Sequence, residues 1–151
     1  APIWIKGPIK KFVNENTIIA GDAAGQAKPT TAGGIFSCGM AGIMAGKAIA
    51  MALKTSEPSK LANYEKMWKG KFGNEFEKQS MARKILSRID NQTINKLFNS
   101  ITPEIIEDIS KKESFDFHTS SIVKLLGVKG SFNAAQLLVG SELRKLLPHQ
   151  D

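Results

Sequence analysis

The sequence predicts a mainly helical chain in which one short strand leads into a glycine-rich helix, followed by a C-terminal helical region. Three patterns carry this prediction: a β-branched run at 17–21, an apolar stretch at 33–53, and helical spacing of large apolar residues from Leu61 onward. The chain has 151 residues, of which 42% are hydrophobic and 23% charged, so it can bury a core. A break at Ser56-Glu57-Pro58-Ser59 divides it into parts 1–55 and 56–151.

The run Thr17-Ile18-Ile19-Ala20-Gly21 lies between Asn16 and Asp22. β-Branched residues bounded by turn residues are typical of a buried strand that ends in a tight turn. Residues 1–16 contain two prolines and Gly7, and we expect them to be extended or loop.

The stretch 33–53 carries a single charge, Lys47, and is long enough to span a membrane. However, ten of its residues are Gly or Ala, which add little transfer energy. A lysine at the bilayer centre would cost roughly 2.5–3.5 kcal/mol. Gly39, Gly42 and Gly46 share one helical face, and we expect that face to let the helix lie directly against a sheet or a cofactor.

The stretch 61–76 predicts a helix with an aromatic face and a basic rim. Its apolar residues recur every three or four positions, at Leu61, Tyr64, Trp68, Phe72 and Phe76. Two interpretations stay open: the face packs on the rest of the chain, or it lies on a membrane surface whose phosphates the lysines meet. Further helices are predicted to begin at Thr102-Pro103, with a threonine cap, and to cover 131–147 before Pro148.

The net charge of +7 is concentrated in residues 60–88, which hold eight basic and three acidic residues. This excess indicates either a solvated helix face or a surface for an anionic ligand. The one cysteine excludes an internal disulfide and suits the cytoplasm. The chain begins at Ala1 without the pattern of a signal peptide, and we expect it to be part of a longer protein.

The loop after the predicted strand contains residue types suited to a bulky ligand that carries the hydroxyl groups of a sugar chain. Asp22 is a fixed acceptor for hydroxyl groups, and the small residues Ala23, Ala24 and Gly25 allow a bulky ligand to approach. Pro29 bends the loop so that the next helix starts toward the ligand. Free N–H groups at that helix start favour negative charge, such as the one on the pyrimidine edge of a reduced flavin.

Three segments together resemble the flavoprotein superfamily that includes the aromatic hydroxylases, and within it most closely the geranylgeranyl reductase family. They are Ile19-Ala20-Gly21-Asp22-Ala23-Ala24-Gly25, Lys28-Pro29-Thr30-Thr31-Ala32-Gly33-Gly34-Ile35, and Ser37-Cys38-Gly39 with Ala41-Gly42. The resemblance is tight over residues 17–50 and loose after Ser59. It implies an α/β parent fold, with this chain closing the FAD-binding domain.

By that resemblance, the cofactor is FAD and Asp22 binds its ribityl chain. Backbone amides of Gly33, Gly34 and Ile35 would face the isoalloxazine ring, with Gly21, Ala23 and Pro29 forming the surrounding loop. Position 32 is Ala where family members often have Gly. The Gly-x-Gly-x-x-Gly fingerprint for the adenine end is absent, so we expect the other half of the site upstream of Ala1 and weak FAD binding by this chain alone.

Four other residues have weaker claims to a function. Cys38 is more simply a small packing residue than a redox thiolate. His118 has no partner at ligand or triad spacing and is expected at the surface or a cap, while His149 lies in a tail. Trp4 either lines a substrate pocket or belongs to the core. No catalytic residue and no metal site emerge.

The resemblance implies a reductase that saturates isoprenoid double bonds of archaeal-type membrane lipids. The lipid would be one partner and an electron donor, such as ferredoxin or nicotinamide, another. We expect a cytoplasmic protein with peripheral contact to the inner membrane face through 61–76. Alternatives are a flavin monooxygenase or quinone-linked dehydrogenase of the same fold, or a basic lipid- or nucleic-acid-binding helical module. The last leaves the segment from Gly21 to Ile35 unexplained and shows no nucleic-acid motif, so we expect no nucleic-acid partner.

Overall fold

The computed structural model describes residues 3–99, 101–112, 114 and 116–119. These residues divide between two compact units, with the boundary after Ser80. The predicted helix at 131–147 and His149 lie outside the described residues. The predicted boundary between parts 1–55 and 56–151 was drawn at the end of the FAD-binding domain that the resemblance implies, and it stays a prediction. In the structure, the helical residues after Ser56 belong to the first compact unit as far as Ser80.

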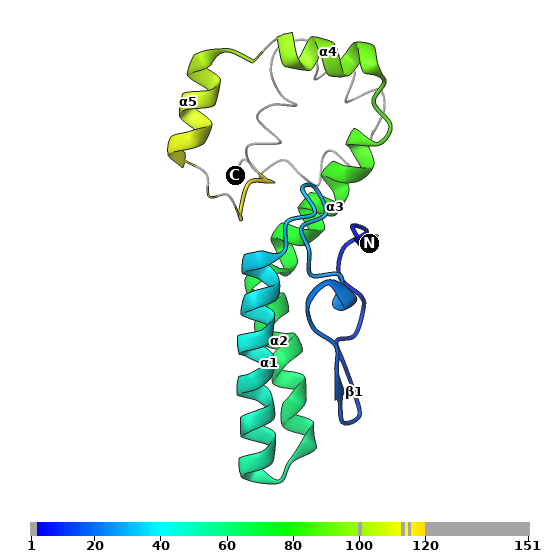
Figure 1. Ribbon diagram of the computed structural model, residues 1–151, viewed down its shortest axis with the longest axis vertical. Helices are drawn as coiled ribbons and strands as arrows, with labels where there is room; N and C mark the ends of the chain where they lie inside the picture. The colour runs from blue at the N-terminus through cyan, green and yellow to red at the C-terminus, as the bar shows by residue number, and fades with distance from the viewer. Residues whose placement is uncertain (1–2, 100, 113, 115, 120–151) are drawn as a thin grey trace, which may run out of the picture. The chain divides into compact units, whose positions relative to one another are not determined.

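The first unit begins with a hairpin rather than with the single buried strand that the sequence predicted. Strands β1 (Val13–Asn14) and β2 (Thr17–Ile18) pair antiparallel, with Val13 opposite Ile18 (Figure 1). β2 ends after two residues, and Thr17 and Ile19 are exposed. The prediction was wrong in length and environment because β2 pairs only with β1 among the described residues, and because the chain coils at Gly21.

Helix α1 (Ile35–Thr55) confirms the predicted glycine-rich helix. It ends at Ser56, whose left-handed φ of 55° turns the chain into the 3₁₀ segment η2 (Pro58–Leu61). Helix α2 (Ala62–Trp68) then returns beside α1 (Figure 1). Among the described residues, α1 is the one helix long and apolar enough to cross a membrane on those two criteria, and one of its faces is buried against α2 and η2.

The aromatic face predicted for residues 61–76 is the core of the first unit. The helical run continues through a π-helical turn η3 (Lys69–Gly73) into α3 (Asn74–Leu86). Tyr64, Trp68, Phe72 and Phe76 recur every fourth residue, and in an ideal α-helix this spacing drifts around the axis because a turn takes 3.6 residues. The wider π turn offsets that drift, so all four rings are at most 1% exposed.

Phe12 joins this aromatic core from the hairpin, with its ring centroid 5.2 Å from that of Trp68 in an edge-to-face arrangement. The carboxylate of Glu65 accepts a hydrogen bond from the Phe12 N–H at 2.8 Å and another from Lys69 Nζ. Burial tends to raise the pKa of Glu65, but these hydrogen bonds hold it below its ordinary value. Because the aromatic face is buried inside the protein, it does not provide the membrane contact suggested for 61–76; the packing interpretation is confirmed.

The second unit contains α4 (Asn91–Asn99) and α5 (Pro103–Lys112). The predicted start of α5 at Thr102-Pro103 is confirmed. α4 was not predicted, although Asp90 just before it is a favoured N-cap residue. In the structure, Asp90 Oδ1 accepts a hydrogen bond from the Thr93 N–H at 2.7 Å, as an N-cap does.

Gln26 ties the glycine loop between β2 and α1 to the aromatic core. Its side chain is fully buried; Oε1 accepts from the Gly21 N–H at 2.7 Å, and Nε2 donates to Tyr64 Oη at 2.8 Å. Tyr64 Oη donates in turn to the Ile19 carbonyl at 3.3 Å. The Gln26 carbonyl accepts from Ser37 Oγ in the first turn of α1 at 2.6 Å. One residue thereby fixes both ends of the loop.

We expect Gln26→Ala to lower the free energy of unfolding by about 2 kcal/mol, because it leaves the Gly21 N–H without its acceptor and removes the hydrogen bond that Tyr64 Oη accepts. Gln92→Ala, the same change at an exposed position of α4, should shift it by less than about 0.5 kcal/mol. Urea unfolding of both variants measures the difference, and equal effects would contradict the assigned role of Gln26.

Ala32 lies in the left-handed region, with φ of 56°. A Cβ there costs roughly 1–2 kcal/mol, whereas glycine tolerates the conformation. We therefore expect Ala32→Gly to raise the free energy of unfolding by about 0.5–1 kcal/mol, the remainder being offset by the greater freedom of glycine in the unfolded chain. Thermal unfolding measures it. A destabilised variant would show that the loop does not hold position 32 in this conformation.

Candidate functional site

The candidate site is the loop from Gly21 to Gly34 and the first turn of α1. Gly21 and Gly25 have φ values of 74° and 69°, in the region that favours glycine, and they bracket the 3₁₀ helix η1 (Gly21–Ala24). A side chain at Gly25 would also collide with the Gly7 carbonyl and the Trp4 ring. The backbone therefore requires glycine at both ends of the segment that carries Asp22.

Asp22 lies beside the start of α1. A Cβ built on Gly34, the residue that precedes the helix, would lie 3.2 Å from Asp22 Oδ1 and 2.9 Å from Cys38 Sγ. The absence of a side chain at Gly34 thus allows the carboxylate to approach the first turn. Asp22 and Ala23 are exposed, and Ile35 is 98% exposed, so this edge of the loop is open to a ligand.

Cys38 donates a hydrogen bond from Sγ to Asp22 Oδ1 at 3.4 Å. Burial, together with the hydrogen bond and negative charge of Asp22, raises the pKa of the Cys38 thiol to about 11. At neutral pH the residue is a neutral thiol, which excludes the thiolate considered from the sequence. The packing interpretation fits, although the side chain is half-buried rather than buried.

The second half of the loop is closed by its own backbone. The Lys28 N–H donates to the Gly33 carbonyl at 3.0 Å, and the Ala32 N–H to the Lys28 carbonyl at 2.9 Å. Pro29 is fully buried, so it shapes the loop and does not offer its side chain to a ligand. Gly33, Gly34 and Ile35 lead directly into α1, which lacks a side-chain cap at Gly34, so the backbone N–H groups of its first turn have no such partner.

Two buried polar residues of this loop were missed by sequence reasoning. Gln26 anchors the loop, and Lys28 is 2% exposed, with its Cε 3.2 Å from where a Cβ on Gly33 would lie. The signal was present, since a glutamine and a lysine interrupt a run of small residues. The partner of the Gln26 side chain was not predictable, because Tyr64 lies 38 residues further along the chain.

The three other candidates are Trp4, which packs against the candidate loop, His118 and the glycine face of α1. Trp4 is 49% exposed, donates from Nε1 to the Gly7 carbonyl at 2.7 Å and packs over Gly25, so it is not a core residue. His118 is half-buried in the second unit. The glycine face of α1 was expected against a sheet or a cofactor, but among the described residues no atom lies within 4 Å of a Cβ built at Gly39, Gly42 or Gly46.

Proteins of known name with similar sequences show which family the chain belongs to. No family model matches the chain. A digeranylgeranylglycerophospholipid reductase of Methanothrix thermoacetophila is 32% identical over 111 residues, which are 72% of this chain and 28% of that protein. Digeranylgeranylglycerophospholipid reductase 1 of Methanococcoides burtonii is 34% identical over 113 residues, or 74% of this chain and 27% of that protein.

A crystal structure of a geranylgeranyl bacteriochlorophyll reductase-like protein from Thermoplasma acidophilum shares the fold. Its TM-score is 0.69 at 20% sequence identity, over 95% of this chain and 33% of that one. The chain thus spans somewhat under a third of the length of these relatives. Over the region that it shares with them, the chain belongs to the geranylgeranyl reductase family.

Proposed function

We propose that this chain supplies the ribityl- and ring-binding half of an FAD site in a longer reductase that saturates isoprenoid double bonds of archaeal-type membrane lipids. The observation that carries the proposal is the approach of the Asp22 carboxylate to the open start of α1, which the missing side chain of Gly34 permits. The names of the relatives supply the substrate class, since two of them are digeranylgeranylglycerophospholipid reductases.

The residues present fit FAD at this edge. Asp22 is an exposed acceptor suited to the hydroxyl groups of the ribityl chain, and its carboxylate is oriented by the thiol of Cys38. The first turn of α1 directs backbone N–H groups and the positive end of the helix dipole outward, which favours an anionic ring edge. Gly33 and Gly34 need no side chain for this contact, because the groups that would face the ring are backbone N–H groups.

When bound, FAD would supply hydride to a carbon–carbon double bond, and this chain's part is to hold and polarise the cofactor. A positive helix end beside the ring stabilises negative charge that develops on reduction. The described residues present no group in the role of proton donor. We assign that role, and the adenine-end site, to the part of the relatives' length that this chain does not span.

The electron donor and location are further parts of the proposal. We infer a cytoplasmic reductase that receives electrons from ferredoxin or nicotinamide and meets its lipid substrate peripherally at the inner membrane face. Because the aromatic face of α2, η3 and α3 is buried, contact with lipid phosphates would fall to exposed lysines of this segment such as Lys66 and Lys71.

The first test uses a polypeptide that contains this chain and has the full length of its relatives. It should purify yellow, with FAD bound. Asp22→Ala should weaken FAD binding about 10- to 100-fold, because a charged hydrogen-bond acceptor is lost. Glu77→Ala, which removes an exposed carboxylate of α3, should leave it unchanged. Flavin absorbance after equilibrium dialysis measures occupancy. A colourless, FAD-indifferent protein would refute the proposal, and full occupancy in Asp22→Ala would refute the role of Asp22.

The reaction is tested on the same polypeptide by anaerobic incubation with a chemical reductant and geranylgeranyl lipids. We expect the lipid mass to rise in steps of two hydrogens. A gain of oxygen in air would indicate a monooxygenase instead, and electron transfer to quinone without any change in lipid mass would indicate a dehydrogenase of the same fold.

A further inference from the structure

A cavity of about 410 Å³ lies in the first unit, where the hairpin meets α2. We call it the basic cavity, because three of its lining residues are lysines. The lining residues are Lys11, Val13, Ala62, Glu65, Lys66 and Lys69. None of them belongs to the loop from Gly21 to Gly34, so the basic cavity is separate from the candidate FAD site.

The one carboxylate that lines the basic cavity is already paired. Glu65 accepts hydrogen bonds from the Phe12 N–H and from Lys69 Nζ. Lys69 Nζ also donates to the Lys10 carbonyl at 2.7 Å. Glu65 and Lys69 therefore balance each other's charge, and both are held against the backbone of the hairpin.

Lys11 and Lys66 supply the charge that remains. Both residues are exposed, and neither side chain forms an ion pair or hydrogen bond with another residue that the structure describes. Three lysines and one glutamate give the basic cavity a net charge of +2. An anionic group between Lys11 and Lys66 would gain charge-assisted hydrogen bonds from both ammonium groups. A phosphate, with one or two negative charges, matches this arrangement.

A second cavity, of about 560 Å³, lies beside the basic one and is mainly apolar. The two cavities adjoin at the hairpin, because Val13 lines the first and its direct partner Ile18 lines the second. Residues paired in this way point to the same face of a hairpin. The cavities also adjoin at the start of α2, where Leu61 and Ala62 are consecutive.

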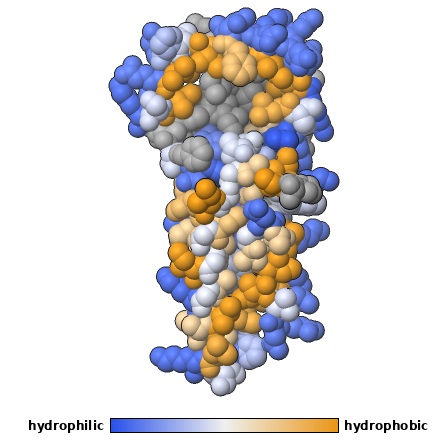
Figure 2. Space-filling view, viewed as in Figure 1, coloured by the Kyte–Doolittle hydropathy of each residue, from blue (hydrophilic) through white to orange (hydrophobic). Residues whose placement is uncertain are grey.

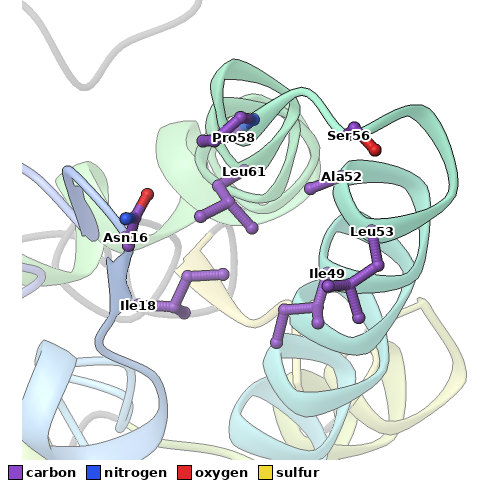
Figure 3. A pocket seen from close by; sticks show the side chains of 8 residues that line it. All are labelled: Asn16, Ile18, Ile49, Ala52, Leu53, Ser56, Pro58 and Leu61. Atoms are coloured by element: carbon purple, nitrogen blue, oxygen red, sulfur yellow. The ribbon is translucent and has the colours of Figure 1, made fainter.

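The far wall of the apolar cavity is the C-terminal half of α1, which contributes Ile49 and Leu53. Leu53 is 76% exposed. In Figure 2 the atoms over α1 and the hairpin are mainly orange to near-white, with blue at the margins. Figure 3 shows Ile18 and Ile49 pointing into the space between the hairpin and α1. This cavity therefore suits a hydrocarbon chain.

We propose that the two cavities together hold one phospholipid, with its phosphate between Lys11 and Lys66 and part of an apolar chain between Ile18, Ile49 and Leu53. A phosphate joined to a long apolar chain matches both cavities, whereas a free phosphate would use the basic one alone. The inference rests on the proposed function for its reaction. It deepens that function by naming residues that select a phospholipid over an isoprenoid without phosphate.

The first test measures the binding of three probes to the polypeptide of the relatives' full length. Excess FAD is present, so that the phosphate probes do not occupy the flavin site. Dihexanoyl phosphatidic acid carries a phosphate and apolar chains, glycerol phosphate carries the phosphate alone, and dihexanoylglycerol carries the chains alone. By calorimetry, we expect the phosphatidic acid to bind at least about 10-fold more tightly than either other probe. Equal binding of two probes that include it, or no binding of any, would overturn the proposal.

The second test removes the two unpaired lysines. Lys11→Gln/Lys66→Gln should weaken the binding of phosphatidic acid and of glycerol phosphate about 10- to 100-fold, because two charged hydrogen bonds are lost. Lys47→Gln/Lys84→Gln removes the same charge at exposed positions outside both cavities and should leave the affinities nearly unchanged. Equal effects of the two double variants would show that only the overall charge matters, which would overturn the proposal.

The third test distinguishes a phospholipid from a free phosphate. Leu53→Gln should weaken the binding of phosphatidic acid several-fold, because apolar contact is lost, and should leave that of glycerol phosphate unchanged. Met51→Gln, at an exposed apolar residue of α1 that does not line the cavity, is the control and should change neither. Unchanged binding of phosphatidic acid by Leu53→Gln would overturn the assignment of the apolar cavity to the lipid chain.

Lipid binding requires no flavin chemistry, so this inference and the proposed function can fail separately. A yellow, active protein whose binding of phosphatidic acid does not depend on Lys11 and Lys66 retains the function and loses the phospholipid site. A colourless protein that binds phosphatidic acid through these lysines retains the phospholipid site and loses the function.

Discussion

The buried amide of Gln26 is the interaction on which the candidate site depends, because it connects three elements that are far apart in the sequence. Through Oε1 it holds the Gly21 N–H, through Nε2 it holds the hydroxyl of Tyr64, and its carbonyl accepts from Ser37 at the start of α1. Tyr64 is in turn fixed by the aromatic core that Phe12 and Trp68 complete. The position of Asp22 relative to α1 follows from these contacts, since the loop between them is short and closed by its own backbone hydrogen bonds. The edge of the loop that faces a ligand can therefore consist of glycine backbone and one carboxylate. The buried hydrogen bonds of Gln26 behind that edge keep the loop rigid.

The sequence was sufficient for those parts of the fold that depend on local spacing. The glycine-rich helix follows from the apolar stretch 33–53, the break from the residue types at 56–59, and the aromatic face from the spacing of large residues after Leu61. Each is present in the structure. The family was also accessible, because the run from Ile19 to Ile35 combines glycines and Asp22 at fixed positions that few other sites require. The match to the Methanothrix reductase, 32% identical over 72% of this chain, supports the same conclusion.

Features that depend on distant partners were not accessible from the sequence. A β-branched run such as 17–21 has the same pattern whether neighbours cover it on one side or on both, so the two-residue strand of an exposed hairpin was taken for a buried strand. The π turn at Lys69–Gly73 leaves no mark in a spacing of four, which fits an α-helix nearly as well. The role of Gln26 rests on a tyrosine 38 residues away, and the left-handed conformation of Ala32 is a property of the closed loop rather than of alanine. The sequence left two interpretations of the aromatic face of 61–76 open for a related reason: aromatic and lysine residues at helical spacing have the same pattern whether the aromatics face a core or a lipid, and the structure shows that they face the core.

We propose above all that Asp22 and the start of α1 form one half of an FAD site. The most direct measurement is a crystal structure of the longer polypeptide with FAD bound. We expect the Asp22 carboxylate within hydrogen-bonding distance of the ribityl hydroxyl groups, and the backbone amides of Gly33, Gly34 and Ile35 beside the isoalloxazine ring. A flavin bound elsewhere, with Asp22 still facing solvent, would contradict it.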